Sequence, residues 1–328
     1  MIHLYEELRK EYLEKKRILL ATQIAPVCGR KYRENEFARI GLTITGGEKY
    51  PFLHQQDGQE FFVEEYTEPA RLVLAGGGHV SLAVAKLAAF LGFRITVIDD
   101  RDDFASRERF PEAETIFCGD IETMLQENCF GRNTYYVILT RGHLDDRKAL
   151  EAVLNKQDYR YAGMIGSRAK VATTMKFLRE KGWTDDKLQQ VHAPIGLPIG
   201  AITPEEIAVS IMAEIIQEMN QQVSDKNQID ILPAIHALTE SAVMVTIIEK
   251  QGSSPRGAGS KMLVGKSGVI TGTIGGGMVE FAAIQEAATL IGSDRSEVRF
   301  YDLSPKNASH LGMICGGQVR VLLESLSK

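Results

Sequence analysis

The stretch Arg71-Leu-Val-Leu-Ala-Gly-Gly-Gly-His-Val-Ser81 decides the fold class, because a short apolar run meets three glycines and then a helical pattern. It fits the spacing G-x-G-x-x-G/A loosely, with Ser81 as the small third residue. Asp99 ends the next apolar run. Glycines let the backbone approach a phosphate at a helix N-terminus, and a strand-end carboxylate can hold ribose hydroxyls. Gly76, Gly78 and Asp99 are therefore candidate nucleotide-binding residues; the alternative is the same turn in a sheet that binds nothing tightly.

Short β-branched runs and helical patterns continue to alternate from this stretch to about residue 220. This alternation predicts an α/β fold with a Rossmann-like parallel sheet, covered by helices on both faces, over residues 70–220. The polar run 221–234 is predicted to be a linker. Residues 1–69 are predicted to be an N-terminal α/β segment, and residues 235–328 a smaller α/β domain with a mixed sheet.

Within the first block, the runs Ile40–Ile44 and Glu60–Glu64 are predicted strands. A third strand-like run, Arg17–Ile24, faintly echoes Ala242–Ile248 near the other end of the chain. A degenerate internal repeat would produce such an echo. Runs this short also match by chance in a chain of 328 residues, and we prefer chance as the explanation.

The composition is that of an ordinary globular protein, with 44% hydrophobic and 25% charged residues and a net charge of −5. The absence of long like-charge runs argues against nucleic-acid binding. No apolar stretch approaches the roughly 20 residues that span a bilayer, and the N-terminus lacks an apolar signal core. We expect a cytoplasmic protein without a membrane partner, whose four scattered cysteines are free thiols.

The block 235–328 contains a second glycine cluster, Gly275, Gly276 and Gly277, at the start of a predicted helix. Exposed N–H groups at a helix N-terminus favour anions, so Arg256 and Lys261 are predicted to complete an anion pocket there.

Cys315 is followed by Gly316 and Gly317, which leave its sulfur open to a bulky ligand, and basic neighbours would favour its thiolate. The alternative for Cys315 is a buried, inert thiol at the start of a strand.

Two further loops follow predicted strands of the parallel sheet. Ligands of open α/β sheets bind beyond the carboxyl ends of the strands, so these loops are candidates to line one crevice. Their polar residues are His143, Asp145, Ser167, Arg168 and Lys170. Ser167 also has the position of a helix N-cap, which we prefer for it.

Taken together, these motifs resemble the XdhC/CoxI family of xanthine dehydrogenase accessory factors. The small-domain motifs are Gly252-Ser-Ser-Pro-Arg-Gly257, Lys261–Val264, Gly272–Gly277 with Val279-Glu280, and Cys315-Gly-Gly317. The Rossmann-domain motifs are Gly76–Val80, Asp99–Arg101, Glu108–Pro111, Gly163–Arg168, His192–Gly196 and Thr203–Ala208. The order of the two domains is the reverse of the usual one in the family, and Arg141 stands where the family has a histidine.

The resemblance implies a chaperone that binds the molybdenum cofactor and delivers it, after sulfuration by a cysteine desulfurase, to a xanthine dehydrogenase-type molybdenum hydroxylase. It implies that Cys315 contacts the cofactor, including its molybdenum; the mononucleotide and dinucleotide forms both stay open. A nucleotide at the Rossmann turn and a homodimer, with one chain's small domain facing the other's Rossmann domain, are further expectations. The alternatives are an NAD(P)-dependent oxidoreductase, for which we find no hydride-transfer partner, and a non-catalytic component of xanthine dehydrogenase.

Overall fold

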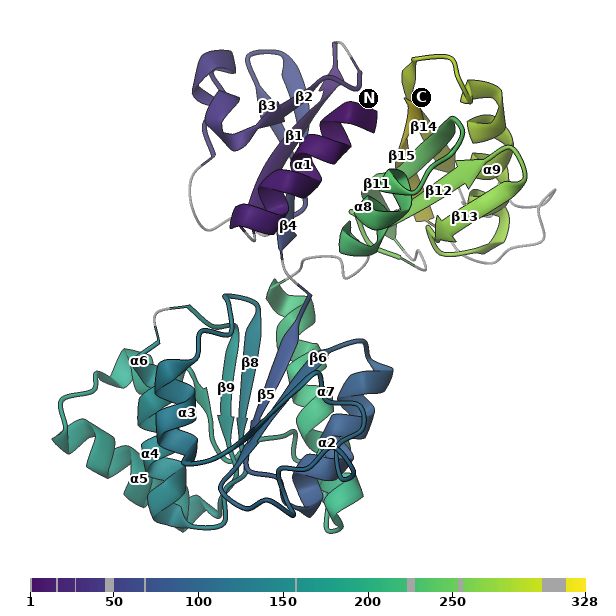
Figure 1. The fold of residues 1–328 in the computed structure, drawn as a ribbon. Coiled ribbons are helices and arrows are strands. Elements are labelled where there is room, and N and C mark those ends of the chain that lie inside the picture. The colour runs from purple at the N-terminus through teal and green to yellow at the C-terminus, as the bar shows by residue number, and fades with distance from the viewer. Residues whose placement is uncertain are drawn as a thin grey trace. The chain divides into compact units, whose positions relative to one another are not determined.

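The computed structural model describes residues 2–15, 17–26, 28–44, 50–67, 69–156, 158–222, 228–252, 256–302 and 317–328. The chain divides into two compact units (Figure 1). Glu68–Gln222 form the first, which we call the Rossmann-like unit. Residues Met1–Thr67 and Val223–Lys328 together form the second, which we call the two-sheet unit. The segment predicted as a separate N-terminal block thus shares one unit with the C-terminal block.

The Rossmann-like unit is built on a six-stranded parallel sheet in the order β10-β9-β8-β5-β6-β7. This confirms the predicted fold class. The strands are β5 (Arg71–Ala75), β6 (Arg94–Asp99), β7 (Thr115–Cys118), β8 (Thr134–Ile138), β9 (Tyr161–Met164) and β10 (Val191–His192). The order reverses between β5 and β8, so the carboxyl ends of these two strands flank the position where open α/β sheets bind ligands.

Helices cover both faces of this sheet, with α2 and α7 on one face and α3, α4 and α5 on the other (Figure 1). Their bounds are α2 (His79–Phe90), α3 (Ile121–Glu127), α4 (His143–Leu154), α5 (Arg168–Glu180), α6 (Asp185–Gln189) and α7 (Pro204–Gln222). Each face has its own apolar core. Because both faces are buried, the central strands are continuous apolar runs without alternation, which is why the sequence predicts a parallel sheet.

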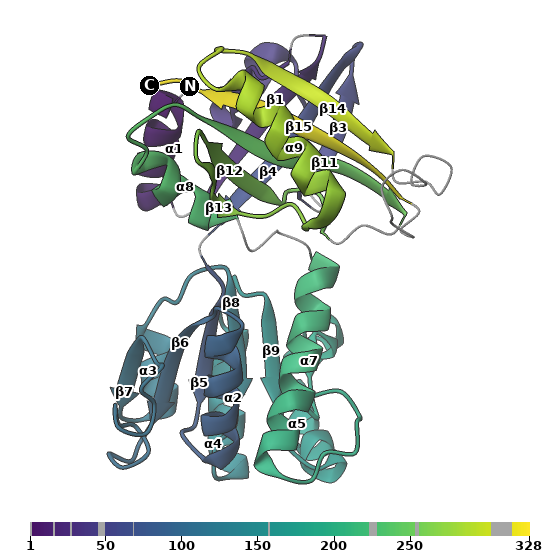
Figure 2. The same cartoon turned by 90° about the vertical axis from the view of Figure 1, so that its right-hand side faces the viewer.

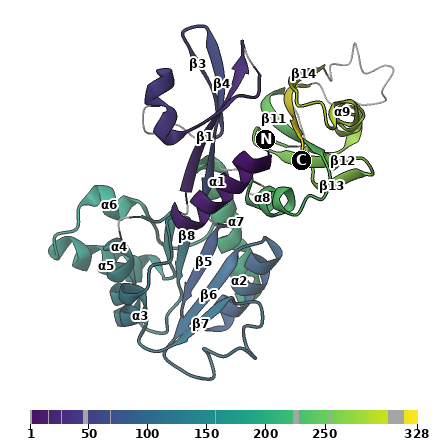
Figure 3. The same ribbon diagram turned by 45° about the horizontal axis from the view of Figure 1, so that its top comes forward.

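The two-sheet unit contains a four-stranded sheet, β2-β1-β4-β3, and a five-stranded sheet, β13-β12-β11-β15-β14. All described strand pairs in both sheets are antiparallel, where a mixed sheet was predicted for the C-terminal part. The first sheet consists of β1 (Arg17–Ala25), β2 (Lys31–Arg33), β3 (Phe52–Gln56) and β4 (Gln59–Thr67) (Figure 3). The second consists of β11 (Ala242–Gly252), β12 (Lys261–Gly265), β13 (Gly268–Gly272), β14 (Ser296–Asp302) and β15 (Gly317–Leu326).

Three helices complete the two-sheet unit: α1 (Ile2–Lys15), α8 (Gln228–His236) and α9 (Gly277–Leu290). Figure 2 shows α9 against the five-stranded sheet, and its apolar side chains share a core with β11, β12 and β15. The helix α8 begins within the predicted linker 221–234 and extends past it to His236. It forms there because its apolar side chains Ile231, Leu232 and Ile235 are buried against α1 and both sheets.

The predicted strand Ile40–Ile44 also differs. Ala38–Ile40 form a short 3-10 helix that ends at Gly41.

Candidate functional site

The turn after β5 brings three glycines against two other loops of the Rossmann-like unit. A Cβ on Gly76 would lie 2.4 Å from the carbonyl oxygen of Leu139, and Gly76 has a φ of 112°. A Cβ on Gly77 would lie 2.4 Å from the carbonyl oxygen of Phe104. At Gly78 nothing lies within 4 Å of an added Cβ. The first two glycines are therefore required by packing, and only Gly78 borders open space.

Gly78 is also the N-cap of α2, and no side chain caps this helix end. Ser81, in the first turn of α2, is fully buried, and its hydroxyl has no hydrogen-bond partner among the described residues. An uncapped helix N-terminus with an open glycine beside it can accept an anion, since its N–H groups and the helix dipole both favour negative charge.

Asp99 has a different role from the predicted one. Its carboxylate accepts hydrogen bonds from the backbone N–H of Gly77 at 2.7 Å and from Nε and Nη2 of Arg101 at 2.8 and 2.9 Å. Although burial raises the pKa of this carboxyl, these donors outweigh it and lower the pKa below its usual range. Asp99 is 2% exposed, so it fixes the glycine turn and is not open to a ribose.

The residues that close the turn belong to the loop after β6. The Arg101 guanidinium lies 3.4 Å from the centre of the Phe104 ring, and Arg109 donates from Nε to the carbonyl oxygen of Gly77 at 3.0 Å. The sequence indicated Arg101 and Arg109 only as parts of the family motifs Asp99–Arg101 and Glu108–Pro111. Their function as a clamp on Gly77 depends on contacts between residues distant in sequence.

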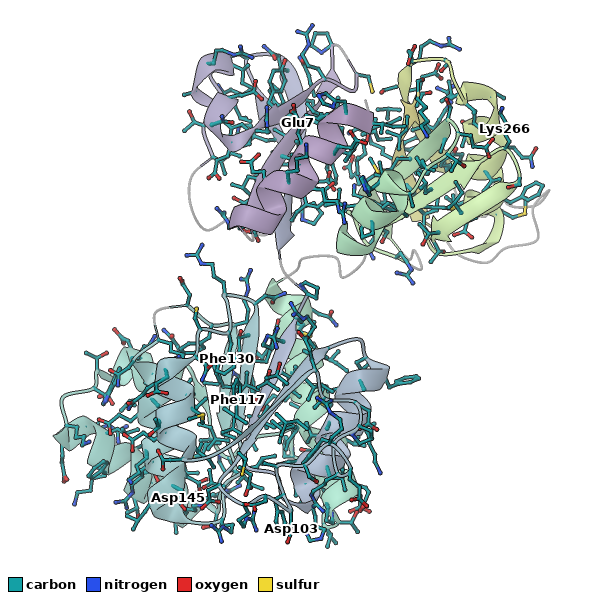
Figure 4. The ribbon with its side chains drawn as sticks, in the orientation of Figure 1. Glu7, Asp103, Phe117, Phe130, Asp145 and Lys266 are labelled. Carbon is teal, nitrogen blue, oxygen red and sulfur yellow. The ribbon has the colours of Figure 1, made fainter. Side chains whose placement is uncertain are left out.

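A pocket lies beyond the carboxyl ends of β6 and β8, and most of its charged lining residues are acidic. It is lined by Asp99, Asp100, Asp120, Ile121, Glu122, Thr140, Arg141, Asp145 and Lys148. Figure 4 shows Asp145 and Asp103 at the same end of the Rossmann-like unit. Arg141 binds Asp100 at 2.9 Å. Apart from Asp99, which is engaged by Gly77 and Arg101, four carboxylates and two cations line the pocket, and this excess of acceptors suits a ligand rich in hydroxyl donors better than a phosphate.

Asp145 lines this pocket, and the other described residues predicted to line a crevice are not among its lining residues. Ser167 caps α5 by accepting a hydrogen bond from the Lys170 backbone N–H at 3.3 Å, as preferred for it. The Lys170 ammonium pairs with the buried Asp146. Arg168 begins α5. The side chain of His143 lies outside the described residues.

One polar cluster of this unit was missed by sequence reasoning. Glu214 of α7 accepts hydrogen bonds from the Tyr161 hydroxyl at 2.5 Å and the Gly196 N–H at 2.9 Å, and lies 3.4 Å from Nδ1 of His192. The hydrogen bond with Glu214 raises the pKa of His192. The cluster fastens the His192–Gly196 loop to α7, so we assign it a structural role.

The glycine triplet of the two-sheet unit has positive φ values at Gly275, Gly276 and Gly277 of 120°, 73° and 67°. Two of its backbone donors are engaged by the chain itself, because the N–H of Gly275 donates to the Thr273 hydroxyl at 3.0 Å and that of Gly276 donates to Glu280. The Glu280 carboxylate accepts from the N–H groups of Ile274 at 3.0 Å and Gly276 at 3.1 Å, and from the Thr273 hydroxyl. Although burial raises the pKa of Glu280, these bonds outweigh it and lower the pKa. An internal carboxylate thus occupies backbone donors that were predicted to bind a ligand anion.

The basic residues predicted beside the triplet have different surroundings. Lys261 is 1% exposed, and its ammonium lies 2.6 Å from Oε1 of Glu64 and 3.1 Å from the Thr246 hydroxyl. It is therefore committed to an internal ion pair and not to a ligand at the triplet. Arg256 is half-buried. Cys315 and Gly316 lie outside the described residues.

No group of three or more His, Cys, Asp or Glu side chains among the residues that the structure describes could hold a metal ion. No helix in the described ranges is long and apolar enough to cross a membrane.

The parallel sheet and its glycine turn define a Rossmann-type domain joined to an antiparallel two-sheet unit. Residues 72–215 match the model of the XdhC Rossmann domain, and residues 236–302 match the model of the XdhC and CoxI family. Together the two matches cover more than half of the chain. The chain therefore belongs to the XdhC and CoxI family.

Three curated proteins are similar to parts of the chain. The uncharacterized protein YqeB of Escherichia coli is 37% identical over 159 residues, which are 48% of this chain and 29% of YqeB. A protein of Bacillus subtilis named as a probable xanthine dehydrogenase subunit is 32% identical over 164 residues, which are 50% of this chain and 47% of that protein. The molybdenum cofactor insertion chaperone PaoD of Escherichia coli is 36% identical over 96 residues, which are 28% of this chain and 30% of PaoD. The matches thus span less than half of each relative's length.

A solved structure of a xanthine dehydrogenase from Bacillus halodurans is similar in fold. It aligns with a TM-score of 0.50 and 22% identity over 66% of this chain and 66% of that chain. At this identity the likeness concerns the fold alone.

Proposed function

We propose that the protein is an accessory factor that binds the molybdenum cofactor and delivers it, after sulfuration, to a xanthine dehydrogenase-type hydroxylase. The observation that carries the proposal is the presence of both family domains in one chain. The relative named as a molybdenum cofactor insertion chaperone and the one named for xanthine dehydrogenase support the same assignment.

Of the two glycine turns, the one before α2 fits the anionic end of such a cofactor better than the one before α9. The uncapped N-terminus of α2, with open Gly78 and unpartnered Ser81, offers donors to a phosphate. At the glycine triplet a phosphate would have to displace Glu280. We therefore propose the α2 N-terminus for a nucleotide end and the triplet as a conditional anion site.

The cofactor's metal end is proposed to lie at Cys315. In the sequence Cys315 precedes Gly317 by two residues, and Gly317 begins β15 opposite Gly252 of β11. When bound, the cofactor supplies a metal centre for which a thiolate is a suitable soft ligand. A cysteine desulfurase and a homodimer in the predicted arrangement complete the proposal.

An oxidoreductase is the weaker candidate. An NAD-dependent enzyme needs a strand-end acid on the ribose, and Asp99 is held by Gly77 and Arg101 instead.

The test is the molybdenum content of the protein purified after co-expression with the cofactor-synthesis proteins. We expect near-stoichiometric molybdenum and a fluorescent oxidised pterin in the parent, and a loss of at least tenfold in Cys315→Ser. Cys118→Ser is the matched control, because Cys118 is exposed at the end of β7 and should leave the molybdenum content unchanged. Equal molybdenum in Cys315→Ser and the parent would contradict the assignment of Cys315. A nicotinamide cofactor that co-purifies with the parent would contradict the chaperone function and favour an oxidoreductase.

A further inference from the structure

The two sheets of the two-sheet unit have the same topology. Along the chain, α1 precedes the strands of the four-stranded sheet, β1 to β4, and α8 precedes those of the five-stranded sheet, β11, β12, β14 and β15, with β13 added at the edge. In space the orders β2-β1-β4-β3 and β12-β11-β15-β14 correspond strand for strand, and all pairs are antiparallel. We call residues 2–67 the N-half and residues 228–328 the C-half.

The registers of the two halves also agree. Thr22 lies opposite Lys31 in the N-half, and Thr246 lies opposite Lys261 in the C-half. With this alignment, Gln23 and Ala25 correspond to Ile247 and Glu249. The register shift in the central pair falls between Gln23 and Ala25 in one half and between Ile247 and Glu249 in the other. Irregularities at the same position are not a general property of antiparallel sheets, since each needs its own extra residue.

The loop after each bulge repeats the same hydrogen bond. The N–H of Gly29 donates to the carbonyl of Gln23 at 2.8 Å, and the N–H of Gly259 donates to the carbonyl of Ile247 at 2.7 Å. The two glycines have φ values of 90° and 92°. Corresponding positions thus share conformation as well as topology.

Buried ion pairs join the halves reciprocally. Lys31 of the N-half lies 2.7 Å from Glu324 of the C-half, and Lys261 of the C-half lies 2.6 Å from Glu64 of the N-half. Glu64 and Glu324 correspond, because they lie opposite Leu20 and its counterpart Met244. All four side chains are at most 2% exposed. In a two-fold interface, each contact between two positions occurs twice, with the two halves exchanged. The pairs Lys31–Glu324 and Lys261–Glu64 have this relation.

Other contacts place the axis of this interface. Arg320 binds Glu60 at 2.7 Å, and these two residues occupy corresponding positions in β15 and β4. One apolar cluster between the sheets is likewise made of corresponding residues, with Ile24 and Ile248 and with Phe62 and Leu322. Residues that meet their own counterparts lie at a two-fold axis.

We propose that the N-half is a diverged copy of the C-half and fills, within one chain, the face through which two such domains would pair. The partner that fits this face is therefore a second copy of the same fold. The copies differ outside the paired face. In the N-half, β3 and β4 are joined by the tight turn Asp57-Gly58, and a segment with two short 3-10 helices stands between β2 and β3, where the C-half has β13, the glycine triplet and α9. Each chain thus carries a paired domain with one glycine-triplet site.

The test reverses charges in one half at a time. The variant Lys31→Glu/Glu64→Lys places like charges against the unchanged C-half, and Lys261→Glu/Glu324→Lys does the same from the other side. Each should raise the unfolding equilibrium constant of the two-sheet unit by at least ~100-fold, because breaking a buried pair is strongly destabilising. The variant with all four changes restores opposite charges and should recover most of this loss. The readout is hydrogen exchange in peptides from β11 and β15.

Three further measurements keep the proposal falsifiable if a double variant does not fold alone. Co-expression of the two double variants, each with a different tag, should give a mixed species in which β11 and β15 regain the hydrogen-exchange protection that each variant lacks alone, since each half then finds its complement on the other chain. The fluorescence of Trp183 should report an unchanged Rossmann-like unit. Reversing the charges of the exposed pair Arg179–Asp185 is the control, and it should change the unfolding equilibrium constant of the Rossmann-like unit less than ~5-fold. A quadruple variant no more stable than the double variants, or the absence of the mixed species, would overturn the reciprocal pairing.

Discussion

The two glycine turns of the chain both hold an internal carboxylate, but they hold it with different donors. After β5, the N–H of Gly77 binds Asp99, which is also held by the guanidinium of Arg101. Before α9, the N–H groups of Ile274 and Gly276 bind Glu280, with the hydroxyl of Thr273 as the third donor. The first carboxylate is part of a charged pair, and the second is held by neutral groups.

This difference determines what an incoming anion must displace. Both carboxylates accept charge-assisted hydrogen bonds, but only Asp99 is also paired with a cation, and displacing it would leave the Arg101 guanidinium without its partner. Asp99 therefore stays in place, and a ligand must use the α2 N-terminus beside Gly78. At the triplet a phosphate has only to replace Glu280 on its neutral donors. A glycine turn is therefore a site only to the extent that its own chain leaves the donors free.

The largest effect is expected from Gly77→Ala. The new Cβ would lie 2.4 Å from a backbone carbonyl, so the loop after β6 must shift. We expect the free energy of unfolding of the Rossmann-like unit to fall by about 3 kcal/mol. Urea unfolding followed by Trp183 fluorescence measures it. Gly78→Ala is the matched control and should change the value by less than about 0.5 kcal/mol; similar losses in both variants would contradict the packing argument.

The next effect is that of Asp99→Asn, which leaves Arg101 without its carboxylate. We expect a loss of about 2 kcal/mol at pH 7. Because the folded pKa of Asp99 is lowered, its contribution is present above the unfolded pKa of about 3.9 and is lost as the pH falls through the folded value. The parent and the variant should therefore converge as the pH falls below that folded value. A difference independent of pH would show that the charge of Asp99 is not what matters.

A smaller loss is expected from Gly276→Ala. Nothing lies within 4 Å of the added Cβ, but the φ of 73° is unfavourable for alanine. The expected cost is about 1–2 kcal/mol in the two-sheet unit, measured by hydrogen exchange in α9. Its comparison with Gly78→Ala isolates the cost of backbone strain, because both positions have space for a Cβ and only Gly276 has a positive φ.

The smallest effect is that of Glu280→Gln, which keeps an acceptor and removes the charge. We expect about 1 kcal/mol of destabilisation at pH 7. Since the folded pKa of Glu280 is lowered, this difference should disappear as the pH falls through that value. If the triplet is a conditional anion site, inorganic phosphate should stabilise the variant more than the parent; equal stabilisation would remove the triplet from the proposed site.

Local sequence was sufficient for the Rossmann-like unit. The continuous apolar runs Arg71–Ala75 and Arg94–Ile98, the glycines between them and the capped helix after Thr203 each contain their own structural signal. The start of α7 is capped by residues close in sequence, because Glu206 accepts from the N–H of Thr203 and the Thr203 hydroxyl accepts from that of Glu206. The glycines Gly76 and Gly78 lie at the turn between β5 and α2, but which candidate residues are available to a ligand was not predictable.

For the internal repeat of the two-sheet unit, by contrast, the local sequence was not sufficient. The echo between Arg17–Ile24 and Ala242–Ile248 was attributed to chance, because only Thr22 with Thr246 and Ile24 with Ile248 are identical at corresponding positions. The structure aligns these strands through a shared bulge and reciprocal ion pairs. Such features arise between residues hundreds of positions apart and leave no periodic pattern in either segment.

The sequence by itself determined the α/β class, the parallel sheet and the two glycine turns, because apolar runs and glycine spacing act over a few neighbouring residues. Only the tertiary structure decided which charged groups are free. Lys261 and Asp99 appear in the sequence as candidate site residues, and Glu280 as part of a family motif. In the structure Lys261 is paired with Glu64, Asp99 with Arg101, and Glu280 accepts hydrogen bonds from backbone N–H groups. Burial makes an unpaired charge costly, so these partners, and not the motif, determine what remains for a ligand.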